Sequence, residues 1–186
     1  MQFLTAKRKR AAVMTTAALL VGVILLVASG CGSSDSDPTS ASEESRAALV
    51  ASDSALLEAV AGAGYPVYWA GPRSGVEYEV SRSPGRTYVR YLPEGEKTES
   101  EQPFLTVGSY QQSNALASVR EQGQKPDAIL VRISGGGTAF AEGPAATNAY
   151  LAFPGTETQV EVFDPEPGKA LSLIREETVV PVGGAG

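Results

Sequence analysis

Hydrophobic residues form one unbroken run near the N-terminus and a series of shorter, periodic segments beyond it. Residues 11–28 carry no charge, whereas the chain after 43 mixes apolar and polar positions over short stretches. Residues 32–42 hold no large apolar side chain, so burial cannot offset the entropy of ordering them and a flexible tether is expected. The pattern predicts one globular domain over 43–183 and a short disordered tail at 184–186.

Three segments show the 3.6-residue spacing of an amphipathic helix. The first is expected over 43–63, where glycines follow the last apolar position. Its apolar residues are Leu49, Val50, Leu56, Leu57 and Val60. The second is expected over 113–123 with Ser113 as N-cap, and the third over 165–176 with Asp164 as N-cap.

The clearest local signal is a β-hairpin centred on Pro84 and Gly85, because Pro presets φ and Gly accepts a positive φ. If Ser83 and Arg86 flank a two-residue turn, two apolar pairs and one pair of opposite charge face each other. These pairs are Val80 with Val89, Tyr78 with Tyr91, and Glu79 with Arg90. A bulge at Gly85, which shifts the register by one residue, is the alternative.

Further alternating segments predict strands, and together with the three helices they indicate an α+β fold. These strands are expected at 104–109, 128–134, 137–141, 147–153 and 158–163. Because hairpin order predominates, we expect a mostly antiparallel or mixed sheet of about six to eight strands.

Two regions resemble each other at an offset of 82 residues. Residues 68–72 and 77–80 correspond to 150–154 and 159–162, which predicts an internal pseudo-repeat. The alternative is chance similarity, since β-strands draw on few residue types.

The N-terminal run has the layout of a secretory signal peptide over 1–30. Four cations at residues 7–10 precede the uncharged stretch, and the small residues Ser29 and Gly30 follow it. The cations are expected to stay in the cytoplasm while the apolar run carries the rest of the chain across the membrane.

The end of this run resembles the lipobox of bacterial lipoproteins, with the sequence Val27-Ala28-Ser29-Gly30-Cys31. The resemblance covers residues 7–31, and Ala28 stands where a Leu is usual. It implies cleavage between Gly30 and Cys31 and a diacylglycerol on the Cys31 sulfur. Dual acylation holds a protein stably at a membrane, whereas a single chain does not.

The alternative for the same run is an uncleaved transmembrane helix, because residues 11–29 come close to the ~20 residues that span a bilayer. Either anchor places the domain at the extracytoplasmic face of the cell membrane. The membrane, reached through lipid on Cys31, is therefore the first expected partner.

Charge and composition narrow the classes of function. Removing residues 1–30 takes away four of the 15 basic residues and none of the 21 acidic ones, which leaves a net charge of about −10. Such a surface repels phosphates, so nucleic-acid binding is not expected. The chain has no His and its one Cys is Cys31, which argues against thiol catalysis, disulfides and Cys/His metal sites. We expect no metal and no cofactor.

The chain shows no catalytic or nucleotide-binding motif, so an enzyme is not the favoured interpretation. The segment 134–137, Ser-Gly-Gly-Gly, could direct backbone N–H groups at an anion, although the apolar residues after it favour a tight connection. Four glutamates between Pro93 and Pro103 lie in a stretch typical of a solvated loop, without the spacing of a calcium site.

Arginines and tyrosines gather around the predicted hairpin, within an otherwise acidic domain. The candidates for a surface that binds an anionic or protein partner are Arg73, Arg82, Arg86, Arg90, Tyr78, Tyr88 and Tyr91. The alternative gives them structural roles: Arg90 pairs with Glu79, Arg82 and Arg86 solvate the hairpin tip, and the tyrosines pack.

Three functions remain open. The first is a non-catalytic binding or accessory module of the bacterial cell envelope, contacting an envelope protein or a soluble ligand. The second is a hydrolase of envelope material that works through carboxylates brought together by the fold. The third is a small solute-capture lipoprotein, for which the chain from Cys31 to Gly186 is short compared with the usual two-lobed architecture.

Overall fold

The computed structural model describes residues 46–98 and 100–184, which belong to one compact unit. The predicted signal peptide at 1–30, the predicted lipidation site Cys31 and the predicted tether lie outside the described residues. Within the described part of the chain, no helix has the length and apolar character of a membrane span.

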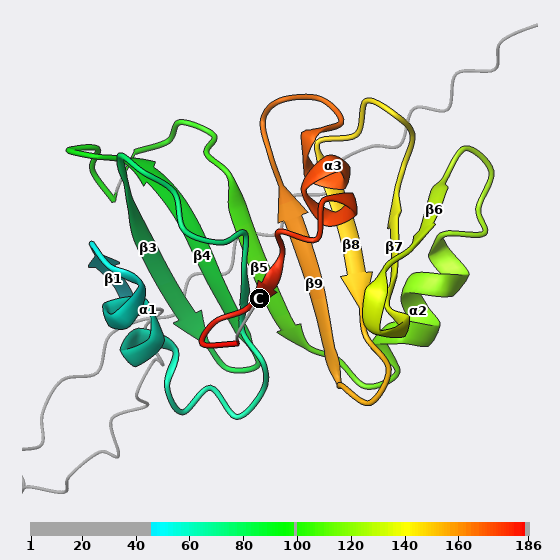
Figure 1. Cartoon of the computed structure of the whole chain (residues 1–186), viewed down its shortest axis with the longest axis horizontal. Helices are drawn as coiled ribbons and strands as arrows, with labels where there is room; N and C mark the ends of the chain where they lie inside the picture. Colours follow the sequence, from blue (N-terminus) through cyan, green and yellow to red (C-terminus); the bar gives the residue numbers. More distant parts are fainter. Residues whose placement is uncertain (1–45, 99, 185–186) are drawn as a thin grey trace, which may run out of the picture. The chain divides into compact units, whose positions relative to one another are not determined.

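Eight strands form one antiparallel sheet in the order β1-β3-β4-β5-β9-β8-β7-β6, and two more strands pair separately (Figure 1). The main sheet contains β1 (Arg46–Val50), β3 (Val76–Ser83), β4 (Arg86–Pro93), β5 (Thr106–Gln111), β6 (Ile129–Arg132), β7 (Thr138–Ala141), β8 (Asn148–Ala152) and β9 (Thr158–Phe163). The separate pair is β2 (Tyr68–Trp69) with β10 (Val180–Pro181).

Three α-helices accompany these strands: α1 (Asp53–Val60), α2 (Ala115–Gln122) and α3 (Lys169–Arg175). The predicted α+β class, with a mostly antiparallel sheet and three helices, is confirmed. The expected six to eight strands match the main sheet, while the described residues hold ten strands in all.

Two runs of consecutive strands meet in the middle of the main sheet. Strands β3, β4 and β5 pair in chain order, as do β6, β7, β8 and β9, whereas β5 pairs with β9. The β5–β9 register places Gly108 opposite Glu161 and Tyr110 opposite Gln159. Residues far apart in the chain therefore lie side by side at the centre of the sheet.

The predicted hairpin is confirmed in every pair. Ser83 lies opposite Arg86, and Gly85 in the turn has a φ of 70°, which a residue with a side chain rarely adopts. The three predicted pairs are also present: Val80 with Val89, Tyr78 with Tyr91, and Glu79 with Arg90.

One face of the main sheet, here called the inner face, carries the core. Side chains alternate along each strand, so the register gathers apolar residues on this side. Its buried residues include Tyr78, Val80, Val89, Tyr91, Val107, Leu151, Val160 and Val162. They form one cluster with Leu56 of α1, Trp69 of β2 and Ile174 of α3.

Helix α2 packs on the opposite face, here called the open face. Ala115 and Val119 form a second, smaller cluster with Phe140 and Ala152, which alternate with the inner-face residues of β7 and β8. Contacts of α2 run to β7, β8 and β9. On β4 and β5, the open-face side chains of Tyr88, Arg90, Thr106 and Tyr110 are only partly buried.

The helix predicted over 43–63 is wrong in its first half. Residues 46–50 form β1 and pair with β3, and only 53–60 are helical. Ser52 divides the two elements, since its Oγ accepts a hydrogen bond from the Ala55 N–H at 3.2 Å and caps the helix. Apolar spacing over five residues fits either element, so the remote partner strand decides which one forms.

Helices α2 and α3 lie within their predicted segments, but the predicted caps are wrong. Asn114, and not Ser113, precedes α2, while Gly168, and not Asp164, precedes α3; both caps have a positive φ and no side-chain capping bond. Asp164 Oδ1 accepts a hydrogen bond from the Glu166 N–H at 2.9 Å, so it closes the turn before the helix.

The segments of the predicted pseudo-repeat have different surroundings. Strands β8 and β9 pair with each other, whereas β2 pairs with β10 and β3 lies in the main sheet. The structure therefore does not show the repeat, although the order of helix, short strand and antiparallel meander occurs twice along the chain.

Candidate functional site

Glu161 lies half-buried on the open face of β9, and both of its carboxylate oxygens accept short hydrogen bonds. The Tyr110 hydroxyl, from β5, donates to Oε2 at 2.6 Å, and Asn148 Nδ2, from β8, donates to Oε1 at 2.6 Å. Thr147 Oγ1 donates to Asn148 Oδ1 at 3.2 Å, which fixes the orientation of the amide. A carboxylate offers about four acceptor positions, so positions for a ligand remain.

Glu161 lines two hollows on the open face, and a third hollow adjoins one of them. The hollow that contains Glu161 together with both of its hydrogen-bond donors, here called the central hollow, measures about 280 Å³ and is lined by Tyr88, Thr106, Gly108, Tyr110, Asn148, Glu161 and Phe163. A hollow of about 530 Å³ extends toward the β3–β4 turn, and one of about 290 Å³ extends toward α2. Neighbouring hollows share Tyr110 and Glu161, or Gln112 and Gln159, so together they form a continuous surface, here called the open-face groove.

Two tyrosines form an aromatic corner in the central hollow. The rings of Tyr88 and Tyr110 are perpendicular, at 90°, with centroids 5.7 Å apart. Gly108 makes this possible, because a Cβ at that position would lie 3.0 Å from the Tyr110 ring and hydroxyl. Phe163 adds a third aromatic side chain at the end of β9.

Two phenols of the groove, those of Tyr110 and Tyr150, have a raised pKa and keep their protons at neutral pH. Burial, followed by the hydrogen bond to Glu161 and the neighbouring Tyr88, raises the pKa of Tyr110 far above its usual value. Burial and the Glu161 carboxylate raise the pKa of Tyr150 to about 12. Both side chains therefore act as neutral hydrogen-bond donors next to the carboxylate.

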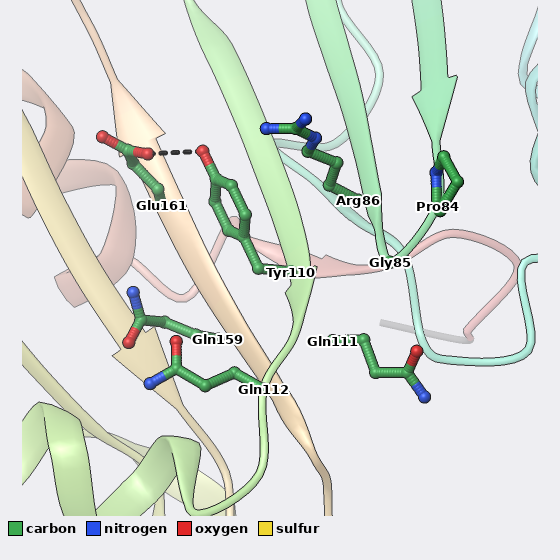
Figure 2. A pocket seen from close by; sticks show the side chains of 8 residues that line it. All are labelled: Pro84, Gly85, Arg86, Tyr110, Gln111, Gln112, Gln159 and Glu161. Atoms are coloured by element: carbon green, nitrogen blue, oxygen red, sulfur yellow. Dashed lines mark hydrogen bonds between the residues drawn. The ribbon is translucent and has the colours of Figure 1, made fainter. Parts of the chain in front are cut away.

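Figure 2 shows the hollow beside the β3–β4 turn. The Tyr110 ring stands between Glu161 and Arg86, and the amides of Gln112 and Gln159 lie close together. The groove therefore offers phenol, amide and carboxylate groups from several strands of one rigid sheet.

The two arginines on the open face of β4, Arg86 and Arg90, bond to groups other than Glu161. Arg86 Nε donates to Ser83 Oγ at 2.8 Å, within the hairpin. In the part of the chain that the structure describes, the one ion pair joins Arg90 to Glu79, with Nη1 and Oε2 3.1 Å apart. Glu161 consequently has no cationic partner among the described residues.

The seven residues predicted as a binding surface do not share one face. The register places Tyr78, Arg82 and Tyr91 on the inner face and Arg86, Tyr88 and Arg90 on the open face. Arg73 precedes β3 and lies over the Tyr91 ring, 5.5 Å from its centroid. Of the seven, Arg86 and Tyr88 line the open-face groove.

The inner-face members of this set hold the fold together. Tyr78 and Tyr91 are buried and pack edge to face, with centroids 5.2 Å apart. Arg82 Nη1 donates to the carbonyls of Ala59 and Ala61 at 3.3 and 3.1 Å, at the end of α1. These contacts stabilise a helix terminus whose carbonyl groups have no partners within the helix.

Arg90 holds the loop between Pro93 and Pro103, here called the acidic loop, against the sheet. Its Nη2 donates to the carbonyls of Ser100 and Gln102, each at 2.6 Å, and its guanidinium lies 5.1 Å from the centroid of the Phe104 ring. The predicted Glu79–Arg90 pair is confirmed.

The glycine-rich segment after β6 forms a tight 3₁₀ turn over Ser134–Gly136. The Ser134 N–H donates to Glu177 Oε1 at 3.1 Å, and hydrogen bonds with Ser134 lower the pKa of the Glu177 carboxyl. The turn therefore meets a carboxylate of its own chain.

Glu161, Tyr110 and Asn148 are functional candidates that the sequence alone does not predict. They come from three strands, and the β5–β9 pairing that joins them is a tertiary contact. The one available signal is the alternation in β9, where Gln159 and Glu161 interrupt an apolar series.

The chain matches no protein-family model, and comparisons with curated proteins and with solved structures find no significant similarity. Within residues 46–98 and 100–184, no three potential metal ligands lie together. The case for a site therefore rests on the geometry of the open-face groove.

Proposed function

We propose that this protein is a non-catalytic binding module of the bacterial cell envelope, exported by a signal peptide at 1–30, anchored through lipid on Cys31, and binding its ligand in the open-face groove. The groove's role rests on one observation: the Glu161 carboxylate, held by Tyr110 and Asn148. Polar atoms that are fixed before binding lose little conformational freedom when a ligand arrives.

The folding of the sheet does not require this arrangement. Taking a carboxylate partly out of water beside aromatic rings costs free energy, and apolar side chains on the same strands would pack without that cost. A hydrogen-bonded carboxylate at such a position, in a hollow lined by polar and aromatic groups, supports a role in recognition.

The carboxylates of the groove suit binding better than hydrolysis. A glycosidase-type mechanism needs two carboxyl groups about 5–10 Å apart on either side of the reacting bond. The other carboxylate of the three hollows is Glu142, which lines the hollow near α2 and not the central one. The central hollow thus holds a single carboxylate among donors and rings.

The anchor is tested by expressing the full chain in a bacterium beside a Cys31→Ser variant. The native chain should appear in the membrane fraction, begin at Cys31 and carry the added mass of a diacylglycerol. Cys31→Ser should lose both the cleavage and the lipid, whereas Ser34→Ala should behave as the native chain. A native polypeptide that begins at Met1 with an unmodified thiol would overturn this half of the proposal.

The groove is tested by purifying the detergent-solubilised protein from membranes and quantifying the envelope components retained with it. A component that depends on the groove should be lost with Glu161→Ala combined with Tyr110→Ala. It should remain with Glu157→Gln, which removes a carboxylate from an exposed position outside the groove. The same retained set for all three proteins would contradict a binding role for the groove.

A further inference from the structure

The open-face groove contains aromatic rings that face no cation. The described residues contain two arginines stacked on rings, Arg73 over Tyr91 and Arg90 over Phe104, at 5.5 and 5.1 Å from the centroids. The perpendicular corner of Tyr88 and Tyr110 has no such partner in that part of the chain, although both rings line a hollow.

The same hollow contains a negative charge without a counter-ion. Glu161 receives its two hydrogen bonds from a phenol and an amide, which are both neutral. Arg86 lies on the far side of the Tyr110 ring and bonds to Ser83. The negative charge of Glu161 is therefore not neutralised by a cation of the described residues and is available to a ligand in the hollow.

From this juxtaposition we infer that the central hollow binds an organic ammonium group, held between the Glu161 carboxylate and the rings of Tyr88 and Tyr110. The inference rests on the proposed function and names the chemistry of its ligand. Aromatic faces attract ammonium groups through the negative face of the ring quadrupole. An adjacent carboxylate adds Coulomb attraction, which is stronger in a partly desolvated hollow than in water.

The dimensions of the hollow suit a small head group. Its volume of about 280 Å³ lies just below the range for small-molecule sites, roughly 300–1,000 Å³. Thr106 and Asn148 place a hydroxyl and an amide in the lining, where they can bond to a polar substituent beside the nitrogen. A phosphate or carboxylate ligand would instead meet the charge of Glu161 directly.

The first experiment titrates the full-length protein, in an alkyl maltoside detergent, with choline and with its neutral carbon isostere 3,3-dimethylbutanol. Saturation-transfer NMR on the ligand methyl groups reports weak binding directly. Choline should bind at least about tenfold more tightly than the isostere, because shape alone cannot supply the charge term. Equal affinity for the two compounds would overturn the inference.

Variants separate the carboxylate from the rings. Glu161→Gln should weaken choline binding about tenfold or more, while Glu157→Gln, with the same change in charge, should leave it unchanged. Tyr88→Leu should weaken binding several-fold and Tyr88→Phe should not, because Phe keeps the ring. Choline binding that is insensitive to both Glu161→Gln and Tyr88→Leu would overturn the inference even if every variant folds.

Two further arms identify the source of the ammonium group and separate this inference from the proposed function. Glu161-dependent binding to phosphatidylcholine vesicles, without binding to free choline, assigns the group to a lipid; binding to free choline assigns it to a soluble molecule. Glu161-dependent binding of a neutral sugar such as N-acetylglucosamine, without choline binding, would overturn the ammonium chemistry and leave the proposed function standing. If no probe and no envelope component depends on Glu161, both fail.

Discussion

The inner and open faces of the main sheet are built from the same strands, yet they differ in what their polar atoms do. On the inner face, alternate residues of β3, β4, β5 and β9 are mostly apolar and pack against α1, β2 and α3. On the open face, most of the residues between them are polar, and they include the hydrogen-bonded pair of Tyr110 with Glu161 and the ion pair of Arg90 with Glu79. We therefore expect substitutions on the inner face to change stability, and, under the proposed function, substitutions on the open face to change binding.

The tyrosines show the contrast most directly. On the inner face, the Tyr91 hydroxyl accepts a hydrogen bond from the Ala70 N–H at 2.6 Å and donates to the Gly71 carbonyl at 3.1 Å, so it fixes the backbone after β2. On the open face, Tyr110 donates to a side-chain carboxylate in a hollow. Replacing Tyr91 should lower the free energy of unfolding, whereas replacing Tyr110 should weaken ligand binding.

The largest expected effect is a cavity in the inner face. Leu151 is fully buried, so Leu151→Ala should lower the free energy of unfolding by about 2–5 kcal/mol. Urea denaturation of the full chain measures the change. The comparison variant is Tyr88→Leu on the open face, for which a loss as large as that of Leu151→Ala would contradict the division of roles.

Removing one buried hydroxyl should have the next largest effect. Tyr91→Phe leaves the Ala70 N–H without its acceptor and should cost about 1–3 kcal/mol of unfolding free energy. Thermal denaturation followed by circular dichroism measures it. Tyr88→Phe makes the same chemical change on the open face and should cost less than about 0.5 kcal/mol. Similar losses for both would show that the two faces do not differ in this respect.

The parts of the fold that could be predicted depend on contacts close in the chain. The Pro84-Gly85 turn and the alternation around it predict the whole β3–β4 register, because each pair lies within one hairpin. Strand β1 could not be predicted, since its five residues take their conformation from pairing with β3. The cap residues of α2 and α3 could not be predicted either. Both helices begin after a residue with positive φ, and neither cap makes the side-chain hydrogen bond on which the prediction relied.

The candidate site, by contrast, depends on contacts between residues far apart in the chain. Glu161 meets Tyr110 and Asn148 only after β5 has paired with β9 and β8 has folded back beside it. Composition pointed to seven Arg and Tyr residues near the hairpin, but alternation places three of them on the inner face, where two belong to the core. Composition therefore indicated residue types suited to binding, while register decides which of them share a surface.

A smaller effect should appear at alkaline pH. Burial and Glu161 raise the pKa of Tyr150 to about 12 from an ordinary value of 10.0. The folded chain therefore holds this proton more tightly than the unfolded chain, so its contribution to stability is complete below pH 10 and is lost as the pH rises toward 12. Tyr150→Phe should lose less stability than the native chain across that window, as measured by urea denaturation at successive pH values. An identical pH dependence for the two proteins would count against the placement of Tyr150 beside the carboxylate.

The smallest expected effect concerns the ion pair on the open face. Glu79→Gln should cost less than about 1 kcal/mol, because the Gln amide oxygen can still accept the hydrogen bond from Arg90 Nη1. Arg90→Met should cost more, since it also removes the donors to the Ser100 and Gln102 carbonyls that tie down the acidic loop. Urea denaturation ranks the two variants, and hydrogen exchange at the loop amides should increase with Arg90→Met alone. If Glu79→Gln loosens the loop to the same extent, the ion pair, and not the backbone contacts of Arg90, holds this edge of the open face together.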